Sequence, residues 1–108
     1  MKWYSDLYIS DSIGKKANKI KWKINHNAGT LDTYVIAFPS NPDNLLDMIP
    51  TTDLLQKAYP KENLHIIGLA KGYYEGIELI QQIITDAYEA TGDVNIKKYL
   101  KSKGRETE

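Results

Sequence analysis

The sequence predicts an α/β fold: a single domain with a mixed sheet of about four strands, in the order β-α-β-β-α-β-α. A short turn, Lys71-Gly72, joins an apolar run from Leu64 to Ala70 to a long amphipathic helix that ends at Gly92. Strand-like and helix-like segments alternate along the rest of the chain, which is typical of α/β proteins. The 108 residues, 42% hydrophobic and 26% charged, have the composition of an ordinary domain with one core.

The first two elements are expected to be a strand and a helix. Residues 2–10 alternate imperfectly between apolar and polar side chains and include β-favouring aromatics, which favours a strand. Ser10, Asp11 and Ser12 are good N-cap residues, and apolar side chains recur at helical spacing from there to Gly29. These apolar positions are Ile13, Ala17, Ile20 and Ile24.

The middle of the chain predicts two short strands and a short helix. Residues 33–38 form a buried-strand pattern, and the Asn-Pro-Asp sequence at residues 41–43 suits a type I turn. Residues 45–49 are then expected to return as a second strand. A threonine that follows Pro50 can cap a helix over residues 53–59, which Pro60 ends.

The C-terminal half supplies the main strand and the longest helix. The expected core side of this helix is Tyr73, Ile77, Ile80, Ile84 and Ala87. Its expected polar side is Glu78, Gln81, Gln82, Thr85 and Glu89. Helical spacing around residues 96–100 predicts one or two further turns. Residues 1–100 are therefore expected to form the domain, and residues 101–108 a flexible basic and polar tail.

Charge is unevenly distributed although the formal net charge is zero. Residues 1–27 hold six lysines against two aspartates, and residues 28–92 hold three lysines against nine acids. This asymmetry predicts a basic side and an acidic side. The absence of cysteine fits a cytoplasmic location, and no apolar run is long enough for a signal peptide or a membrane span.

The first predicted helix separates an apolar face from a basic face. Five residues make up the basic face: Lys15, Lys16, Lys19, Trp22 and Lys23. An exposed tryptophan among lysines can anchor a protein partner or stack on single-stranded nucleic acid. A competing interpretation makes residues 19–25 a strand with Trp22 buried, because apolar and basic residues also alternate there. The flanking cap and glycine signals favour the helix.

The strand–helix junction, residues 68–76, is an alternative site suited to a small ligand or an anion, and this alternative includes an enzyme. Helix N-terminal amides can hold an anion there, with Lys71, Gly72, Tyr73 and Tyr74 as the binding residues. The spacing matches neither the dinucleotide fingerprint nor the Walker motif. The competing interpretation is structural: Gly72 permits the turn, Gly76 lets the helix approach the sheet, and Tyr73 is core.

Enzymatic motifs are weak in this chain. His26 and His65 belong to no metal or triad spacing, and no serine has the nucleophile-elbow context. Asp43, Asp47 and Asp53 could surround Mg²⁺, but turns and helix starts use the same residues. The sequence predicts no catalytic residue, metal or cofactor.

Three segments resemble a group of short bacterial proteins without an assigned function. They are residues 34–46, 54–57 and 66–73. The resemblance covers nearly the whole chain and implies a complete one-domain protein, but no reaction. The favoured hypothesis is a non-enzymatic protein that binds a macromolecule through its basic helix face. A protein partner or self-association is favoured over nucleic acid, which usually binds to proteins of high isoelectric point.

Overall fold

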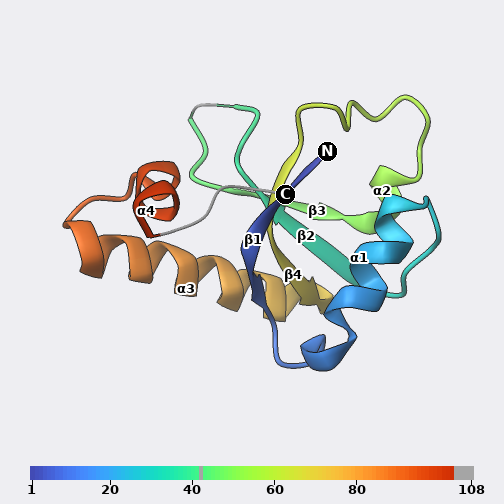
Figure 1. Ribbon diagram of the computed structural model, residues 1–108, viewed down its shortest axis with the longest axis horizontal. Helices are drawn as coiled ribbons and strands as arrows, with labels where there is room; N and C mark the ends of the chain where they lie inside the picture. Colours follow the sequence, from blue (N-terminus) through green and yellow to red (C-terminus); the bar gives the residue numbers. More distant parts are fainter. Residues whose placement is uncertain (42, 104–108) are drawn as a thin grey trace.

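The computed structural model describes residues 1–41 and 43–103, and it confirms the predicted fold class (Figure 1). Four strands form one sheet: β1 (Lys2–Ile9), β2 (Thr33–Ala37), β3 (Asp47–Pro50) and β4 (His65–Lys71). The helices are a 3-10 turn η1 (Gly14–Lys16), α1 (Ala17–Asn25), α2 (Thr51–Leu54), α3 (Gly72–Thr91) and α4 (Ile96–Lys103).

The sheet is mixed, with the strand order β1-β4-β2-β3. Strand β1 pairs parallel with β4, whereas β2 pairs antiparallel with both β4 and β3. The carboxyl ends of β1 and β4 therefore lie at the same edge of the sheet. Ser10 connects them there, because its amide donates to the Leu69 carbonyl and its hydroxyl accepts from the Lys71 amide, both at 3.0 Å.

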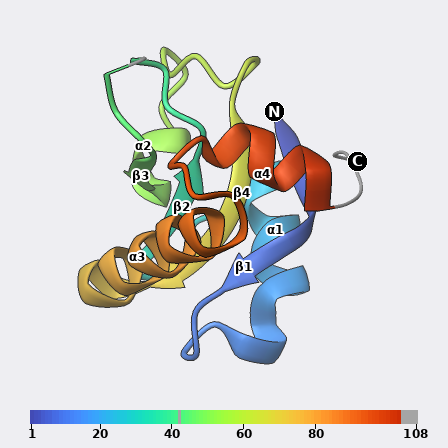
Figure 2. The ribbon, with the colours of Figure 1, turned by 90° about the vertical axis from the view of Figure 1, so that its left-hand side faces the viewer.

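Each face of the sheet is covered by its own helices. Trp3, Val35 and Ile66 pack with Ile24 of α1 and Leu54 of α2 on one face. On the opposite face, buried residues of the sheet pack against α3 and α4. They are Tyr4, Ile36, Ile67 and Ala70 from the sheet, with Leu79, Ile83, Ala87, Ile96 and Leu100 from the helices. Figures 1 and 2 show the resulting three layers, with the sheet between α1 and the α3–α4 pair.

The first helix forms where it was expected, but it starts differently. No side chain caps η1 or α1. Instead, the Ser10 carbonyl accepts the amides of Ile13 and Gly14, which starts the 3-10 turn. The expected N-cap role of the serines is therefore wrong, because Ser10 and Ser12 donate or accept across to the β4–α3 segment. Residues 19–25 are helical, so the strand interpretation is also wrong.

The middle elements are shifted or shortened. Strand β3 begins two residues later and ends one residue later than expected, and α2 is a single turn at Thr51–Leu54 rather than a helix over residues 53–59. Leu54 is buried but residues 55–58 are all exposed, so these four residues have no buried face that would stabilise a second helical turn. The Asn41 carbonyl accepts the Asn44 amide, as a turn requires, whereas Pro42 lies outside the described residues.

Helix α3 has the predicted length and stop, with Gly92 in the left-handed conformation at φ 74°. Its expected polar side is exposed or nearly so throughout. The expected core side is rotated, because the residues closest to the sheet are Gly76, Leu79, Ile83 and Ala87. Ile80 and Ile84 lie on the flank, and Tyr73 is 54% exposed, so its assignment to the core is wrong.

Helix α4 reaches Lys103, three residues into the expected tail. The rest of that tail, residues 104–108, lies outside the described part of the chain. Ile96 and Leu100 are almost fully buried, and the Tyr4 hydroxyl donates to the Leu100 carbonyl at 3.1 Å. The last helix is therefore an integral part of the core.

Candidate functional site

Helix α1 presents Trp22 to solvent while its other face packs on the sheet. Ile24 is buried and Ile20 packs partly against the same core, whereas 58% of Trp22 is exposed. The end of the helix is fixed, because the Trp3 indole nitrogen donates to the Asn25 side chain at 2.9 Å. Trp22 is therefore exposed because it lies on the outer face of a helix that is held in place by the core.

A second ring supports the exposed tryptophan. The ring of His26 stacks on Trp22 with a centroid distance of 4.1 Å and an interplanar angle of 20°. His26 Nδ1 lies 2.7 Å from the Trp22 carbonyl oxygen, which holds the imidazole in this orientation. The pair forms a flat aromatic platform at the C-terminal end of α1. Such a platform can contact an apolar or aromatic group of a partner.

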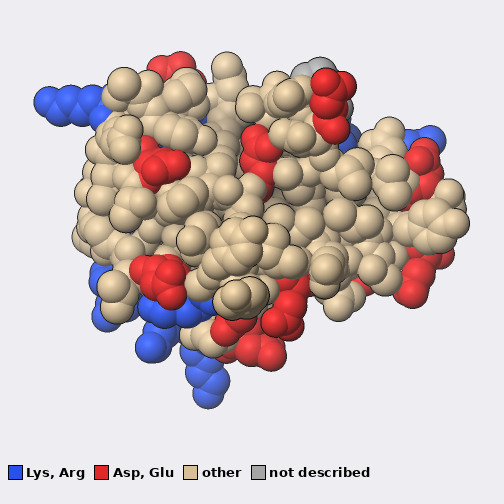
Figure 3. All heavy atoms as spheres, turned by 180° about the vertical axis from the view of Figure 1, so that it is seen from behind, with Lys and Arg blue, Asp and Glu red and all other residues tan. Residues whose placement is uncertain are grey.

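The lysines predicted beside Trp22 do lie on η1 and α1, but they differ in how far their side chains are exposed. Lys15, Lys16 and Lys19 are exposed, whereas Lys23 is partly buried. Lys21, outside the predicted set, instead lies 5.4 Å from the ring centre of Trp3. Figure 3 shows several basic side chains gathered at one lower corner of the molecule, directly beside a group of acidic side chains. We call the η1–α1 surface formed by Lys15, Lys16, Lys19, Trp22, Lys23 and His26 the α1 surface.

The alternative site at the β4–α3 junction is largely engaged by the fold itself. The Gly72 amide donates to the Asp32 carbonyl at 2.7 Å, and the Lys71 ammonium donates to the Leu31 carbonyl at 2.8 Å. Gly72 has a φ of 78°, which explains its presence as a turn residue. Tyr73 and Tyr74 stand outside, at 54% and 81% exposure.

The protein places its own carboxylate at the start of α3. Glu75 lies in the first turn, where the helix dipole favours negative charge, and it accepts bonds from the Ser12 amide and hydroxyl. The Ser12 hydroxyl and then the Ser10 hydroxyl hold the pKa of Glu75 below its ordinary value. Asp11 and Glu78 line the same hollow, which has a volume of about 440 Å³. This negative charge disfavours an external anion.

Gly76 has the packing role that the sequence suggested for it. It is buried on the face of α3 that meets the sheet, and a Cβ atom there would clash with the sulfur of Met48 on β3. The two glycines of the junction therefore have structural explanations, a turn and a close approach.

The three aspartates considered for Mg²⁺ have local roles or lie apart. Asp47 accepts the Ser40 amide at 3.2 Å, the Asp43 amide bonds to the Asn41 side chain, and Asp53 lies in the first turn of α2. Within residues 1–41 and 43–103, no group of three or more His, Asp or Glu side chains is arranged to hold a metal ion. No helix in this part of the chain is long and apolar enough to span a membrane.

A cleft at the opposite edge of the sheet has no counterpart in any local sequence pattern. It has a volume of about 610 Å³ and lies where β1 and β4 begin. Its wall includes Lys2, Phe38, Asp47, Tyr59, His65 and Lys97. Sequence patterns single out only His65 and Asp47 among these residues, each for another reason, because the positions that line the cleft are far apart along the chain.

No protein-family model, curated protein or solved structure matches this chain. The α1 surface, the β4–α3 junction and the cleft are therefore judged on their own geometry.

Proposed function

We propose that this protein is a non-enzymatic binding domain that docks an acidic protein partner on its α1 surface. The exposed Trp22, held flat against His26 on a helix anchored to the core, carries the proposal. Rigid, exposed aromatic side chains are enriched among the residues that dominate interface energies. The exposed lysines around it supply the charge that attracts an acidic partner.

A protein partner fits the α1 surface better than nucleic acid does. Lys21 lies over Trp3 and Lys23 is partly buried, which leaves three exposed lysines on η1 and α1. Nucleic-acid sites usually carry a longer basic track and a high isoelectric point, whereas the formal net charge here is zero. The absence of cysteine fits a reducing compartment, so we assign this role to the cytoplasm.

Iodide quenching of tryptophan fluorescence tests whether the platform is accessible and becomes covered. Trp3 is 4% exposed, so iodide should quench Trp22 selectively in the free protein, helped by the nearby positive charge. The quenchable component should vanish in Trp22→Phe. It should become protected when a partner binds. A quenchable fraction that is already absent in the free protein would contradict the proposal.

A matched pair of variants tests which surface is used. Trp22→Ala should abolish retention of partners from a cell extract, whereas Tyr88→Ala should not. Tyr88 is the control because it is 59% exposed on α3, away from the α1 surface. Equal losses in the two variants would contradict the proposed surface. Tight binding of a short oligo(dT), with a salt slope of about 0.7 per phosphate contact, would instead identify nucleic acid as the partner.

A further inference from the structure

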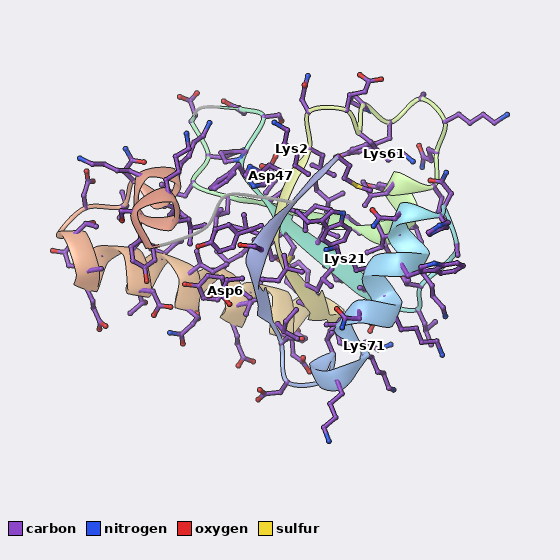
Figure 4. All side chains as sticks on the ribbon, viewed as in Figure 1. Lys2, Asp6, Lys21, Asp47, Lys61 and Lys71 are labelled. Atoms are coloured by element: carbon purple, nitrogen blue, oxygen red, sulfur yellow. The ribbon has the colours of Figure 1, made fainter. Side chains whose placement is uncertain are left out.

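The cleft at the amino ends of β1 and β4 has the size of a small-molecule site. Its volume of about 610 Å³ falls within the range of about 300–1,000 Å³ that is typical of ligand pockets. Segments 38–40 and 59–65 form much of its wall. Figures 1 and 4 show this edge of the sheet between the loops that follow β2 and α2, with Lys2 at its centre.

One side of the cleft carries a row of cationic and aromatic side chains. Lys2 pairs with His65 in the parallel register of β1 and β4, so both side chains lie on the same face of the sheet. The next member is Phe38, whose amide donates to the His65 carbonyl at 3.1 Å. The Phe38 ring meets the His65 ring edge to face, with centroids 4.8 Å apart.

Helix α4 completes this row with Lys97. Its ammonium lies 6.0 Å from the centre of the Phe38 ring. The position of Lys97 is fixed because Ile96, the preceding residue, is 3% exposed in the core. Both lysine side chains are otherwise exposed, so their ammonium groups remain available to a ligand. An aromatic ring with a cation at each end of the row suits a planar ligand that carries an anionic group.

The other side of the cleft limits how much negative charge a ligand can bring. Asp47 and Glu62 line it, together with the ring of Tyr59. Burial, and then the carboxylates of Asp47 and Asp53, raise the pKa of Tyr59, so its hydroxyl stays protonated and can donate a hydrogen bond. Two carboxylates opposite two lysines disfavour phosphate-rich ligands and allow a single negative charge.

We propose that this cleft binds a small aromatic monoanion, with its ring against Phe38 and its carboxylate at the Lys97 end of the row. The site is independent of the α1 surface, because the two share no residue. It would make the domain a ligand-responsive or ligand-carrying protein in addition to any macromolecular binding.

A titration with benzoate, followed by the amide signal of Phe38 and the ring signals of His65, tests the proposal. Benzoate at millimolar concentration should shift these signals before those of Gly72 or Trp22. Lys97→Ala should weaken the affinity about three- to fivefold, as loss of one partly exposed ion pair predicts. Lys98→Ala is the matched control because it removes the neighbouring exposed lysine, which does not line this cleft, and it should leave the affinity unchanged.

Comparison ligands separate the contributions of charge and ring. Benzyl alcohol, which lacks the charge, and inorganic phosphate, which lacks the ring, should both shift these signals less than benzoate does. Equal shifts with benzyl alcohol would overturn the role of the lysines, and equal shifts with phosphate would overturn the role of the ring. Absence of any benzoate-induced shift at Phe38 and His65 would overturn the site itself.

Discussion

At the scale of single residues, Glu75 determines which chemistry the start of α3 can support. A helix N-terminus attracts anions because its first amides have no partners within the helix. Here the carboxylate of Glu75 supplies that negative charge from within the fold, and Ser12 holds it in place. The contact also ties the β1–η1 segment to α3 across 63 positions of the chain.

Removing the Ser12 hydroxyl should change the titration of Glu75. In Ser12→Ala the carboxylate loses its strongest stabilising bond, so its pKa should rise toward the ordinary value. The pKa is depressed in the folded protein, so this bond stabilises the fold at neutral pH, and its contribution is lost as the pH falls through the carboxyl range below about 4.3. NMR titration of the Glu75 carboxyl carbon measures the effect.

The control is Ser102→Ala on α4, which should leave the pKa of Glu75 unchanged. An unchanged Glu75 pKa in Ser12→Ala would refute the role assigned to the Ser12 hydroxyl.

Residues with a purely local signal were predictable from the sequence. The turn at Gly72, the close approach at Gly76 and the exposure of Trp22 each follow from a local pattern, and the structure confirms all three. The partners of Ser12 and Glu75 could not be predicted in this way. Both have good local roles, as a cap and as a first-turn acid, and their contact depends on how two distant segments meet.

At the scale of elements, α3 shows why a helix can be predicted correctly while its phase is not. Its apolar arc is wide, because isoleucines occupy the flank as well as the centre of the buried face. A helical wheel drawn from the sequence centres the buried face on the average direction of all the apolar side chains. In the structure, the residues that pack on the sheet include Leu79 and Ile83. Tyr73 precedes that contact region, and its ring packs edge to face on the ring of Tyr34 with centroids 6.4 Å apart.

The observed orientation of α3 predicts that alanine substitutions along it lower the free energy of unfolding by different amounts. Ile83→Ala should lower the free energy of unfolding by about 2–5 kcal/mol, because Ile83 is 0% exposed and its removal leaves a cavity. Ile84→Ala should cost less, since Ile84 lies on the flank. Gln81→Ala is the exposed control and should change stability by less than about 0.5 kcal/mol. Urea denaturation of the three variants orders them, and a larger effect at Ile84 than at Ile83 would favour the phase predicted from the sequence.

At the scale of the whole molecule, long-range contacts determine both the cleft and the domain boundary. Residues 2, 38, 65 and 97 meet only because β1 and β4 pair and α4 folds back over them. No local pattern contains that information. The sequence places part of α4 in the tail for the same reason, since lysines dominate its composition while its buried residues are Ile96 and Leu100, with Tyr99 partly buried beside them.

This arrangement predicts that α4 unfolds together with the rest of the domain. Leu100 is 1% exposed and its carbonyl accepts the Tyr4 hydroxyl, so the last helix is joined to the first strand. Trp3 lies beside Tyr4 on the opposite face of the sheet and reports on the other core. In a Trp22→Phe background, Leu100→Ala should therefore shift the unfolding midpoint equally by Trp3 fluorescence and by circular dichroism. The expected cost is about 2–5 kcal/mol, and Lys101→Ala, which changes an exposed neighbour, should cost little. If the circular dichroism signal of Leu100→Ala were lost before the Trp3 fluorescence changed, and the Trp3 midpoint were unchanged, α4 would be a separate, weakly held unit. The Lys97 side of the cleft would then form only when α4 is docked.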